Sequence, residues 1–338
     1  MSNEERARWG ILGTANIARK ALVPGIRDSE SSGLYAVASR DVTRADKFGE
    51  EFDVPERYGT YEELLNDSRV EFVYIPLPNH LHKKWTIKAA EAGKHVLCEK
   101  PLGLNKKEVE EMFAVAEEND VKLMEGFMYR FHPQVQRVKE IIERGDIGEP
   151  TFFRGAFSFP MVAQDREDDI RWKDEMGGGS LMDLGTYSIN TVRFLFGEEP
   201  SRVFARSSYH PNHTAEAETQ AIMEFPDGRS ATFDVSFLLD DRASYEVVSD
   251  SGSVKAFNTY GPGMGKRVNI EIIRGVSREQ ETLGPINEYA LEVDGLVDAA
   301  AQNSKPLITR EDSINQACVM DALRRSAEEE NWVEVKWG

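Results

Sequence analysis

The stretch "GILGTANIARK", residues 10–20, decides how the N-terminal part of this chain is interpreted. It follows the apolar segment "ARWGIL" and opens a segment with helical spacing, which is the setting of a dinucleotide-binding loop. Such a loop carries Gly-x-Gly-x-x-Gly, and the three positions here hold Gly13, Ala15 and Ala18. Gly13 permits the tight turn, and Ala is accepted at the third position. Ala15 adds one methyl group, which predicts a small shift of the pyrophosphate rather than its exclusion.

Strand-like and helical segments alternate from this loop to about residue 127. This alternation predicts a doubly wound parallel sheet with helices on both faces, the Rossmann arrangement. Hairpin patterns such as "ETQAIMEFPDGRSATFDVSF" then predominate and predict an α+β domain with a mostly antiparallel open sheet. We therefore predict a dinucleotide-binding Rossmann domain over 1–127 and a substrate-binding and oligomerisation domain over 128–338. The C-terminal helix, residues 310–330, has the length to pack back on the first domain.

Composition excludes several classes of function. The net charge of −18 disfavours nucleic acid as a partner, because the phosphates would be repelled. No segment has the roughly 20 apolar residues of a membrane span, and the charged start "MSNEERARWG" lacks a signal-peptide core. These features predict a cytoplasmic protein, and the two cysteines, Cys98 and Cys318, predict neither a disulfide framework nor a metal site. The acidic surface serves either solubility or adaptation to high salt, and both interpretations stay open.

The second predicted strand ends in "AVASR", with Ser39 and Arg40 about twenty residues beyond the loop. A basic residue at this place suits the 2′-phosphate of NADP, whereas NAD sites carry a carboxylate there. We therefore predict NADP, with NAD as the alternative if the Asp41 carboxylate turns inward. The predicted cofactor contacts in this region are Gly13, Thr14, Ala15, Asn16, Ile17, Ser39 and Arg40.

Two further motifs, "PLPNHLH" at 76–82 and "CEKPLG" at 98–103, follow predicted strands at their C-terminal ends. Ligands of open parallel sheets bind at these ends, so Lys100 is expected to meet the nicotinamide end of the cofactor. A surface ion pair between Glu99 and Lys100, and ordinary loop polarity for the histidines, are the alternatives. The additional predicted cofactor contacts are Pro78, Asn79, His82, Glu99 and Lys100.

Taken with "EGFMYRFHP" and "GGGSLMDLGTY", these motifs make the chain resemble the Gfo/Idh/MocA oxidoreductase family over nearly its whole length. The resemblance implies a Rossmann domain, an open-sheet domain, and hydride transfer between NAD(P) and a sugar-like alcohol. Many inositol dehydrogenases of the family carry His where this chain has Tyr187. The tyrosine form resembles the branch of dihydrodiol dehydrogenases, glucose–fructose oxidoreductases and NADP-dependent D-xylose 1-dehydrogenases.

The resemblance also implies catalytic roles for Lys100, Asp183 and Tyr187. Tyr187 would accept the hydroxyl proton. An unperturbed tyrosine has a pKa of about 10, which is too high for ready proton loss near neutrality. The nearby Lys100 ammonium would favour the phenolate and so lower the pKa of Tyr187. Asp183 lies four residues before Tyr187, on the same helix face, and would orient Lys100 or a sugar hydroxyl. A core role for Tyr187 and a helix-dipole role for Asp183 are the alternatives.

The predicted substrate contacts are Lys100, Phe157, Arg171, Trp172, Asp183 and Tyr187. Phe157 also fits an ordinary core position. The expected activity is NADP-dependent oxidation of a free aldose at C1, most like a D-xylose 1-dehydrogenase. A dihydrodiol-type or glucose–fructose-type oxidoreductase is the alternative enzyme, and a non-catalytic NADP-binding sensor is the alternative of another class. We expect apolar residues to alternate on an exposed face of the second-domain sheet, through which a homodimer or homotetramer would form.

Overall fold

The computed structural model describes residues 6–164, 166, 168–260 and 266–337. Residues 1–5, on which part of the signal-peptide prediction rests, lie outside the described residues. The chain divides into two compact units. The first unit consists of residues 1–131 and 287–314, and the second of residues 132–286 and 315–338.

The first unit is built on a parallel sheet with the strand order β3-β2-β1-β4-β5-β6. Its strands are β1 (Ala7–Leu12), β2 (Ser32–Ala38), β3 (Glu56–Tyr58), β4 (Phe72–Ile75), β5 (His95–Glu99) and β6 (Leu123–Gly126). This order is that of the dinucleotide-binding fold, so the predicted Rossmann sheet is confirmed. The inner strands are buried on both faces, as expected for a parallel sheet between two helical layers.

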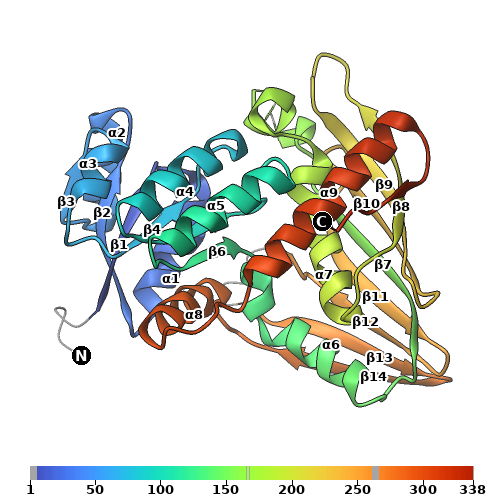
Figure 1. Ribbon diagram of the computed structural model, residues 1–338. Coiled ribbons are helices and arrows are strands. Elements are labelled where there is room, and N and C mark those ends of the chain that lie inside the picture. Colours follow the sequence, from blue (N-terminus) through green and yellow to red (C-terminus); the bar gives the residue numbers. More distant parts are fainter. Residues whose placement is uncertain (1–5, 165, 167, 261–265, 338) are drawn as a thin grey trace. The chain divides into compact units, whose positions relative to one another are not determined.

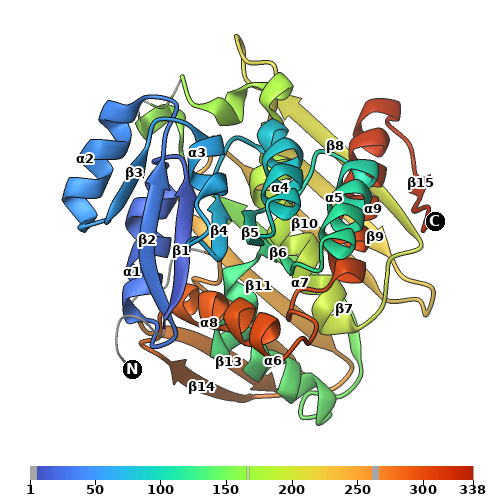
Figure 2. The same ribbon diagram turned by 60° about the vertical axis from the view of Figure 1, so that its left-hand side comes forward.

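Helices of the first unit begin at side-chain caps that the sequence supplies. Asn105 accepts a hydrogen bond from the Glu108 N–H at 3.0 Å, and Thr60 forms a capping box with Glu63. In Figures 1 and 2, α4 and α5 run side by side, and α1 lies beside α8. The helices are α1 (Val23–Asp28), α2 (Val42–Phe52), α3 (Tyr61–Asn66), α4 (His82–Glu91), α5 (Lys106–Glu118) and α8 (Glu288–Ala301).

The division of the chain differs from the sequence prediction, which placed all of 128–338 in the second domain. Residues 128–131 and 287–314 belong to the first unit. The physical reason is the close packing of α8 on α1, where a Cβ at Gly25 would lie 2.8 Å from the Tyr289 Cβ. Helix α9 (Arg310–Glu329) is shared, because its residues as far as Ile314 belong to the first unit and the remainder to the second.

The second unit contains a nine-stranded sheet with the order β14-β13-β12-β11-β7-β10-β9-β8-β15. Only β7 and β10 pair in parallel among these described strands, so the prediction of a mostly antiparallel sheet is confirmed. The strands are β7 (Pro150–Ser158), β8 (Arg202–Tyr209), β9 (Glu216–Glu224), β10 (Ser230–Ser236), β11 (Arg242–Ser249), β12 (Ser253–Phe257), β13 (Val268–Arg274), β14 (Ser277–Leu283) and β15 (Val333–Glu334).

The two faces of this sheet differ in chemistry. Helices α6 (Pro133–Glu143) and α7 (Thr186–Phe196) pack on one face, which carries buried residues such as Phe153, Phe233 and Val235. The other face, called the open face below, presents the alternate residues of the strands, and these are mainly polar or charged. The expected regular alternation of apolar residues on the exposed face is wrong, because most apolar residues of the inner strands, such as Phe233 and Val235, lie on the covered side.

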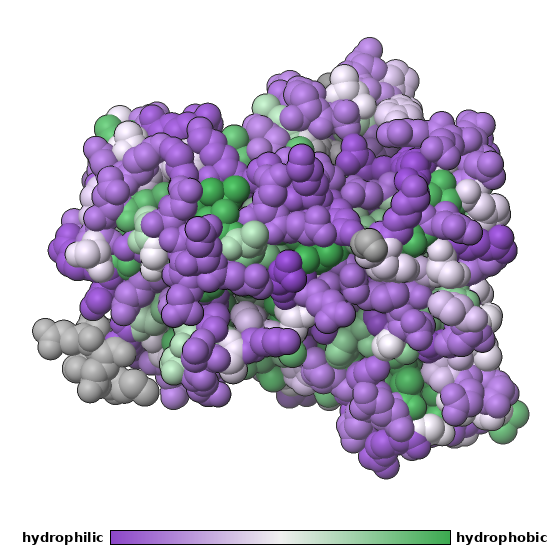
Figure 3. Space-filling view, viewed as in Figure 1, coloured by the Kyte–Doolittle hydropathy of each residue, from purple (hydrophilic) through white to green (hydrophobic). Residues whose placement is uncertain are grey.

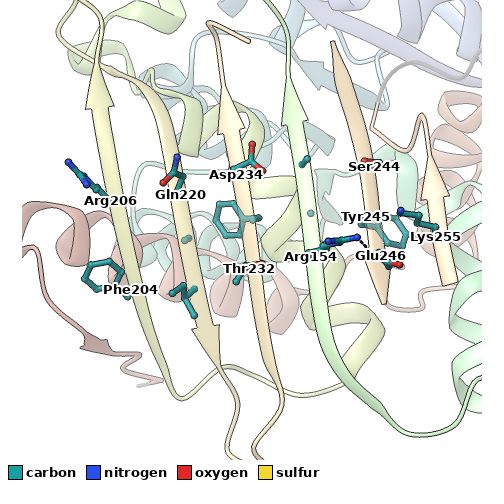
Figure 4. Close-up of a pocket in the computed structure, with 15 residues that line it drawn as sticks. Arg154, Phe204, Arg206, Gln220, Thr232, Asp234, Ser244, Tyr245, Glu246 and Lys255 are labelled. Atoms are coloured by element: carbon teal, nitrogen blue, oxygen red, sulfur yellow. Dashed lines mark ion pairs between the residues drawn. The ribbon is translucent and has the colours of Figure 1, made fainter. Parts of the chain in front are cut away.

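Ion pairs between neighbouring strands stabilise the open face. Arg154 of β7 pairs with Glu246 of β11 at 2.5 Å, as Figure 4 shows. At one end of the sheet, Arg202 pairs with Glu224 at 2.6 Å. Hydrophilic residues also predominate over the surface in Figure 3, as the 59 acidic and 41 basic residues lead one to expect. Among the described helices, none combines the length and the apolar character that crossing a membrane requires.

Candidate active site

The glycine-rich turn follows β1 and leads directly into the first helical turn of the chain. Gly13 has a φ of +100°, a conformation that L side chains rarely adopt, and its N–H bonds the Ala38 carbonyl at 2.8 Å. A Cβ at Gly13 would lie 3.1 Å from Leu77 and 3.6 Å from the Tyr61 hydroxyl. The helix begins at Asn16, so the turn presents free backbone N–H groups, which suit a pyrophosphate. This glycine cradle fits a dinucleotide.

The end of β2 carries the candidate residues for the 2′ position of the cofactor. Ser39 is buried, whereas Arg40 is exposed and lies near the hydroxyl of Tyr61. Burial raises the pKa of Tyr61, and Arg40 opposes this rise. Asp41 caps α2 by accepting the Thr43 N–H at 3.0 Å. The Asp41 carboxylate is thus directed to its own helix, while Arg40 lies beside the tyrosine that borders Gly13.

Two loops extend from β4 and β5 at the same edge of the sheet. Pro78 and Asn79 begin a short 3₁₀ turn after β4, and Lys100 follows the last residue of β5. Glu99 accepts a hydrogen bond from the Tyr74 hydroxyl at 2.5 Å. The loop after β5 is held by the Leu102 N–H, which donates to Glu125 at 2.9 Å. Lys100 therefore lies in a loop whose backbone is tied to a buried carboxylate.

His82 connects these two loops. Its ring is completely buried, with Nδ1 2.9 Å from the Pro101 carbonyl oxygen and Nε2 2.7 Å from the Leu77 carbonyl oxygen. Burial lowers the pKa of His82 to about 4. Both ring nitrogens face backbone carbonyls, and no ring surface is left to contact a cofactor. The structure thus gives His82 a role in holding the loop of Lys100, in place of the direct contact that the sequence predicted.

In the second unit, Asp183 and Tyr187 lie at the start of the helix that packs on the sheet. A π-helical turn, Leu181–Gly185, carries Asp183 and runs directly into α7, which begins one residue before Tyr187. Three glycines precede it, and Gly177 and Gly179 have φ values of +74° and +110°. The chain can therefore turn sharply into the helix, which places Asp183 one turn before Tyr187.

Tyr187 is surrounded by aromatic rings. Its own side chain is 6% exposed, and its ring centroid lies 5.5 Å from that of Phe157 and 5.2 Å from that of Tyr260. The Tyr260 hydroxyl donates to Thr191 at 3.1 Å, and the Thr191 hydroxyl donates to the Tyr187 carbonyl at 2.7 Å. The sequence prediction missed Tyr260, since no motif connects it to a helix so far away in the chain.

Arg171 and Trp172 have different settings, although they are adjacent. Arg171 donates from Nε to Asp183 at 2.6 Å, and Asp183 and then Asp169 raise the pKa of its guanidinium. Trp172 is 1% exposed and stacks on His213 with ring centroids 4.3 Å apart. Trp172 is thus a core side chain, in contrast to the substrate contact predicted for it. The structure brings Arg171 and Asp183 together, whereas the sequence suggested Lys100 as one partner of Asp183.

The predicted residues form one group in each unit. The first unit brings the glycine turn, Arg40 and the loops of Asn79 and Lys100 to one edge of its sheet. The second unit joins Phe157, Arg171, Asp183 and Tyr187. Within the described residues, no group of three or more His, Cys, Asp or Glu side chains is arranged to hold a metal ion.

None of the predicted site residues lines the hollow of about 450 Å³ that lies on the open face of the sheet. Figure 4 shows side chains from successive strands pointing into it, with Arg206 toward one side and Lys255 toward the other. The labelled residues are Arg154, Phe204, Arg206, Gln220, Thr232, Asp234, Ser244, Tyr245, Glu246 and Lys255. The ion pair between Arg154 and Glu246 belongs to its lining.

Comparison with known proteins identifies relatives along nearly the whole chain. Residues 7–127 match an oxidoreductase family with an NAD-binding Rossmann fold, and residues 135–255 match the GFO/IDH/MocA C-terminal domain. An uncharacterized oxidoreductase of Rhizobium meliloti is 37% identical over 97% of this chain and 99% of its own length. A D-xylose 1-dehydrogenase (NADP(+)) of Haloferax volcanii is 35% identical over 97% of this chain and 99% of its own.

A solved structure resembles the present one closely. It is a 3-ketoreductase from Actinomadura kijaniata in complex with NADP and TDP-benzene, 30% identical, with a TM-score of 0.90. The match covers 95% of this chain and 98% of that chain. Relatives of this fold therefore include both a sugar dehydrogenase and a ketoreductase.

Proposed function

This chain belongs to the Gfo/Idh/MocA oxidoreductase family, and we propose that it oxidises C1 of a free aldose to the lactone with NADP, most like a D-xylose 1-dehydrogenase. The substrate is supported by the full-length similarity to the D-xylose 1-dehydrogenase of Haloferax volcanii. The similar ketoreductase structure, which was solved with NADP, supports the cofactor.

The observation that carries the proposal is the different use of Arg40 and Asp41. Arg40 lies near the hydroxyl of Tyr61, which borders the Gly13 cradle, and this position supports a contact between its guanidinium and the 2′-phosphate. Asp41 instead accepts the Thr43 N–H and hydroxyl, at 3.0 and 2.6 Å. A carboxylate used to cap its own helix is not directed at a ribose hydroxyl, which favours NADP over NAD.

In the proposed mechanism, NADP, when bound, accepts the hydride from C1 of the sugar. Tyr187 accepts the proton of the C1 hydroxyl, and Lys100 binds the same hydroxyl and stabilises the phenolate. Asp183 accepts a hydrogen bond from a second sugar hydroxyl. The sugar thus loses one hydride and one proton and becomes the lactone. The ring of Phe157, packed against Tyr187, offers an apolar surface to the C–H face of the sugar.

The test is a substrate panel measured with NADP and with NAD through the absorbance of the reduced nicotinamide. We expect turnover with D-xylose and related aldoses and a higher kcat/KM with NADP. Turnover with dihydrodiols or keto sugars alone would assign one of the other oxidoreductase activities. Binding of NADP without turnover of any substrate would favour the sensor.

A variant of Arg40 tests the cofactor preference separately. Arg40→Ser is expected to lower the kcat/KM for NADP at least 10-fold relative to that for NAD, because a charge-assisted bond to phosphate is lost. Arg44→Gln is the matched control, since Arg44 is an exposed arginine next to Asp41. An unchanged ratio in Arg40→Ser would contradict the assignment of Arg40.

We also propose that copies of the chain associate through the open face of the sheet. The net charge of −18 opposes association elsewhere, whereas ion pairs compensate much of the charge on this face. Exposed apolar side chains, including Ile222 and Phe257, lie among the charged ones. A monomeric mass in solution would contradict this proposal.

A further inference from the structure

The second unit holds a row of alternating charges that ends at Asp183. Arg166 binds Asp169 at 2.6 Å, Asp169 binds Arg171 at 3.2 Å, and Arg171 binds Asp183 at 2.6 Å. The carboxylates of Asp169 and Asp183 are only 17% and 16% exposed. Shielded charges interact more strongly than exposed ones, so these ion pairs hold their side chains more firmly than ordinary surface ion pairs do.

The backbone of Arg171 is attached to the same segment as its side chain. The Arg171 carbonyl accepts the Gly179 N–H at 2.8 Å. A Cβ at Gly178 would lie 2.4 Å from that carbonyl oxygen, so only glycine allows this approach. Arg171 is therefore held to the start of the Asp183 turn at two points, which leaves its guanidinium little freedom to move.

Aromatic contacts lead from the other end of the row to the same helix. The Arg166 guanidinium lies over the Phe159 ring, 5.5 Å from its centroid. Phe159 contacts Phe157, and Phe157 contacts Tyr187. The charged row and the aromatic row thus end one helical turn apart, at Asp183 and at Tyr187.

From this geometry we infer that Arg171 is a positioning residue for Asp183, which keeps the carboxylate ionised and directed, and that it is not itself a ligand for the sugar. The inference rests on the proposed function and deepens it. Nε and Nη1 of Arg171 already bond Asp183 and Asp169, whose charges compensate its own. An anionic group would gain little from such an arginine, so the site favours an uncharged sugar over a sugar acid or a sugar phosphate.

Other titratable groups border this segment, among them Asp174, which lies near Glu216. Tyr187 lies one turn beyond Asp183, and Glu216 of β9 accepts the Leu181 N–H at 2.8 Å. A pH-dependent effect has to be separated from these groups, which the Glu216→Gln variant and an assigned Asp183 signal accomplish.

The kinetic test compares Arg171→Gln, Asp183→Asn and the double variant. A misdirected carboxylate is expected to lower kcat/KM about 100-fold in Arg171→Gln. The acid limb of its pH profile should move to higher pH, because the nearby cation that favours the carboxylate is gone. In Arg171→Lys the acid limb should stay at its wild-type pH. The kcat/KM of the double variant should be no lower than that of Asp183→Asn. Arg137→Gln, which removes another partly shielded pair, with Glu281, should leave the profile unchanged.

Two kinetic results would overturn the inference. One is an Arg171→Gln variant with a raised KM for the sugar and an unchanged kcat and acid limb, since that is the behaviour of a direct ligand. The other is an additive double variant, because residues that act through one another are not additive.

A measurement without substrate separates this inference from the proposed function. Aspartate labelled with ¹³C at the carboxyl group gives an Asp183 signal, assigned by its loss in Asp183→Asn. Its titration midpoint should move to higher pH in Arg171→Gln and stay in place in Arg137→Gln and Glu216→Gln. A moved midpoint without turnover of any aldose would refute only the proposed function, and turnover with an unmoved midpoint would refute only the inference.

Discussion

The two sheets of this protein hold their candidate residues in different ways. The parallel sheet of the first unit is buried on both faces, and its candidate residues lie in loops at the ends of β1, β2, β4 and β5. The nine-stranded sheet of the second unit has one covered and one open face, and its candidate residues lie on a helix packed on the covered face. The end of a strand can be recognised from the local sequence. The orientation of a helix on a sheet instead depends on contacts with residues that are far away in the sequence.

This difference appears in the partners of the key residues. Lys100 follows β5 directly, and its loop is held by His82 and Glu125, which come from the same set of strands and loops. Tyr187 instead contacts Phe157 and Tyr260, and Asp183 contacts Arg171.

The largest effect is expected for Lys100→Ala and Tyr187→Phe. Each should lower kcat by about 10²- to 10⁴-fold, because in the proposed mechanism Tyr187 accepts the proton and Lys100 stabilises the resulting phenolate. The double variant should lose little more than the poorer single variant, since the two groups act as a unit. Steady-state kinetics with the best aldose measures these losses.

Binding of NADP, followed by the fluorescence quenching of the protein, is the control for intact folding of these variants. Near wild-type turnover in either single variant would contradict the assignment of Lys100 and Tyr187.

The buried titratable groups of the two units should change the stability of the protein with pH in opposite directions. Burial raises the pKa of Glu216 in the second unit to about 7, and it lowers the pKa of His82 in the first unit to about 4. The contribution of Glu216 to stability is present below pH 4.5 and is lost as the pH rises to about 7. The contribution of His82 is present above pH 6.5 and is lost as the pH falls to about 4.

Glu216→Gln isolates the effect in the second unit. Between pH 5 and pH 8 the wild type should lose about 3 kcal/mol more of its free energy of unfolding than this variant, measured by urea denaturation. Glu218→Gln, two residues along the same strand, is the matched control. Equal pH dependence in the wild type and Glu216→Gln would show that the Glu216 carboxyl is not the group responsible.

A smaller effect is expected when one glycine in each unit is replaced by alanine. A Cβ at Gly178 would meet the backbone oxygen of Arg171 at 2.4 Å, whereas one at Gly10 would meet the end of the Leu64 side chain at 2.8 Å. Since a side chain can move aside more easily than a backbone, Gly178→Ala should cost about 3 kcal/mol of stability and Gly10→Ala about 1 kcal/mol. Thermal unfolding of both variants gives the comparison.

Activity sharpens this test, because only Gly178→Ala displaces Arg171 from Asp183. That variant should therefore lose turnover beyond its loss of stability, while folded Gly10→Ala should keep it. A loss of stability or turnover that is larger in Gly10→Ala than in Gly178→Ala would contradict the role given to the close approach of Gly178 and Arg171.

Local sequence was enough to predict much of the first unit. The position of Gly13 between strand and helix predicted a tight turn, and the structure gives it a positive φ. The alternation of strands and helices predicted the parallel sheet, although not the order of its strands. Sequence reasoning failed where distant segments meet. It placed α8 in the second unit, because the packing of Tyr289 against Gly25 leaves no mark in either segment.

The candidate site shows the same division. The motifs led to the proposal that Lys100, Asp183 and Tyr187 carry the chemistry. They did not identify His82 as the link between two loops, Trp172 as a core side chain or Arg171 as the partner of Asp183. Burial and ion pairing depend on which surfaces meet, and spacing along the chain contains no information on that.

The sequence by itself therefore determined the fold class, the family and the residue types of the site, because these depend on periodicity and short motifs. Only the tertiary structure decided that Asp41 caps its own helix while Arg40 lies beside Tyr61. It also decided that the apolar side of the inner strands in the large sheet is covered, which leaves a mainly polar and charged face open. These outcomes depend on the direction of each side chain, which is set by contacts with residues far away in the chain.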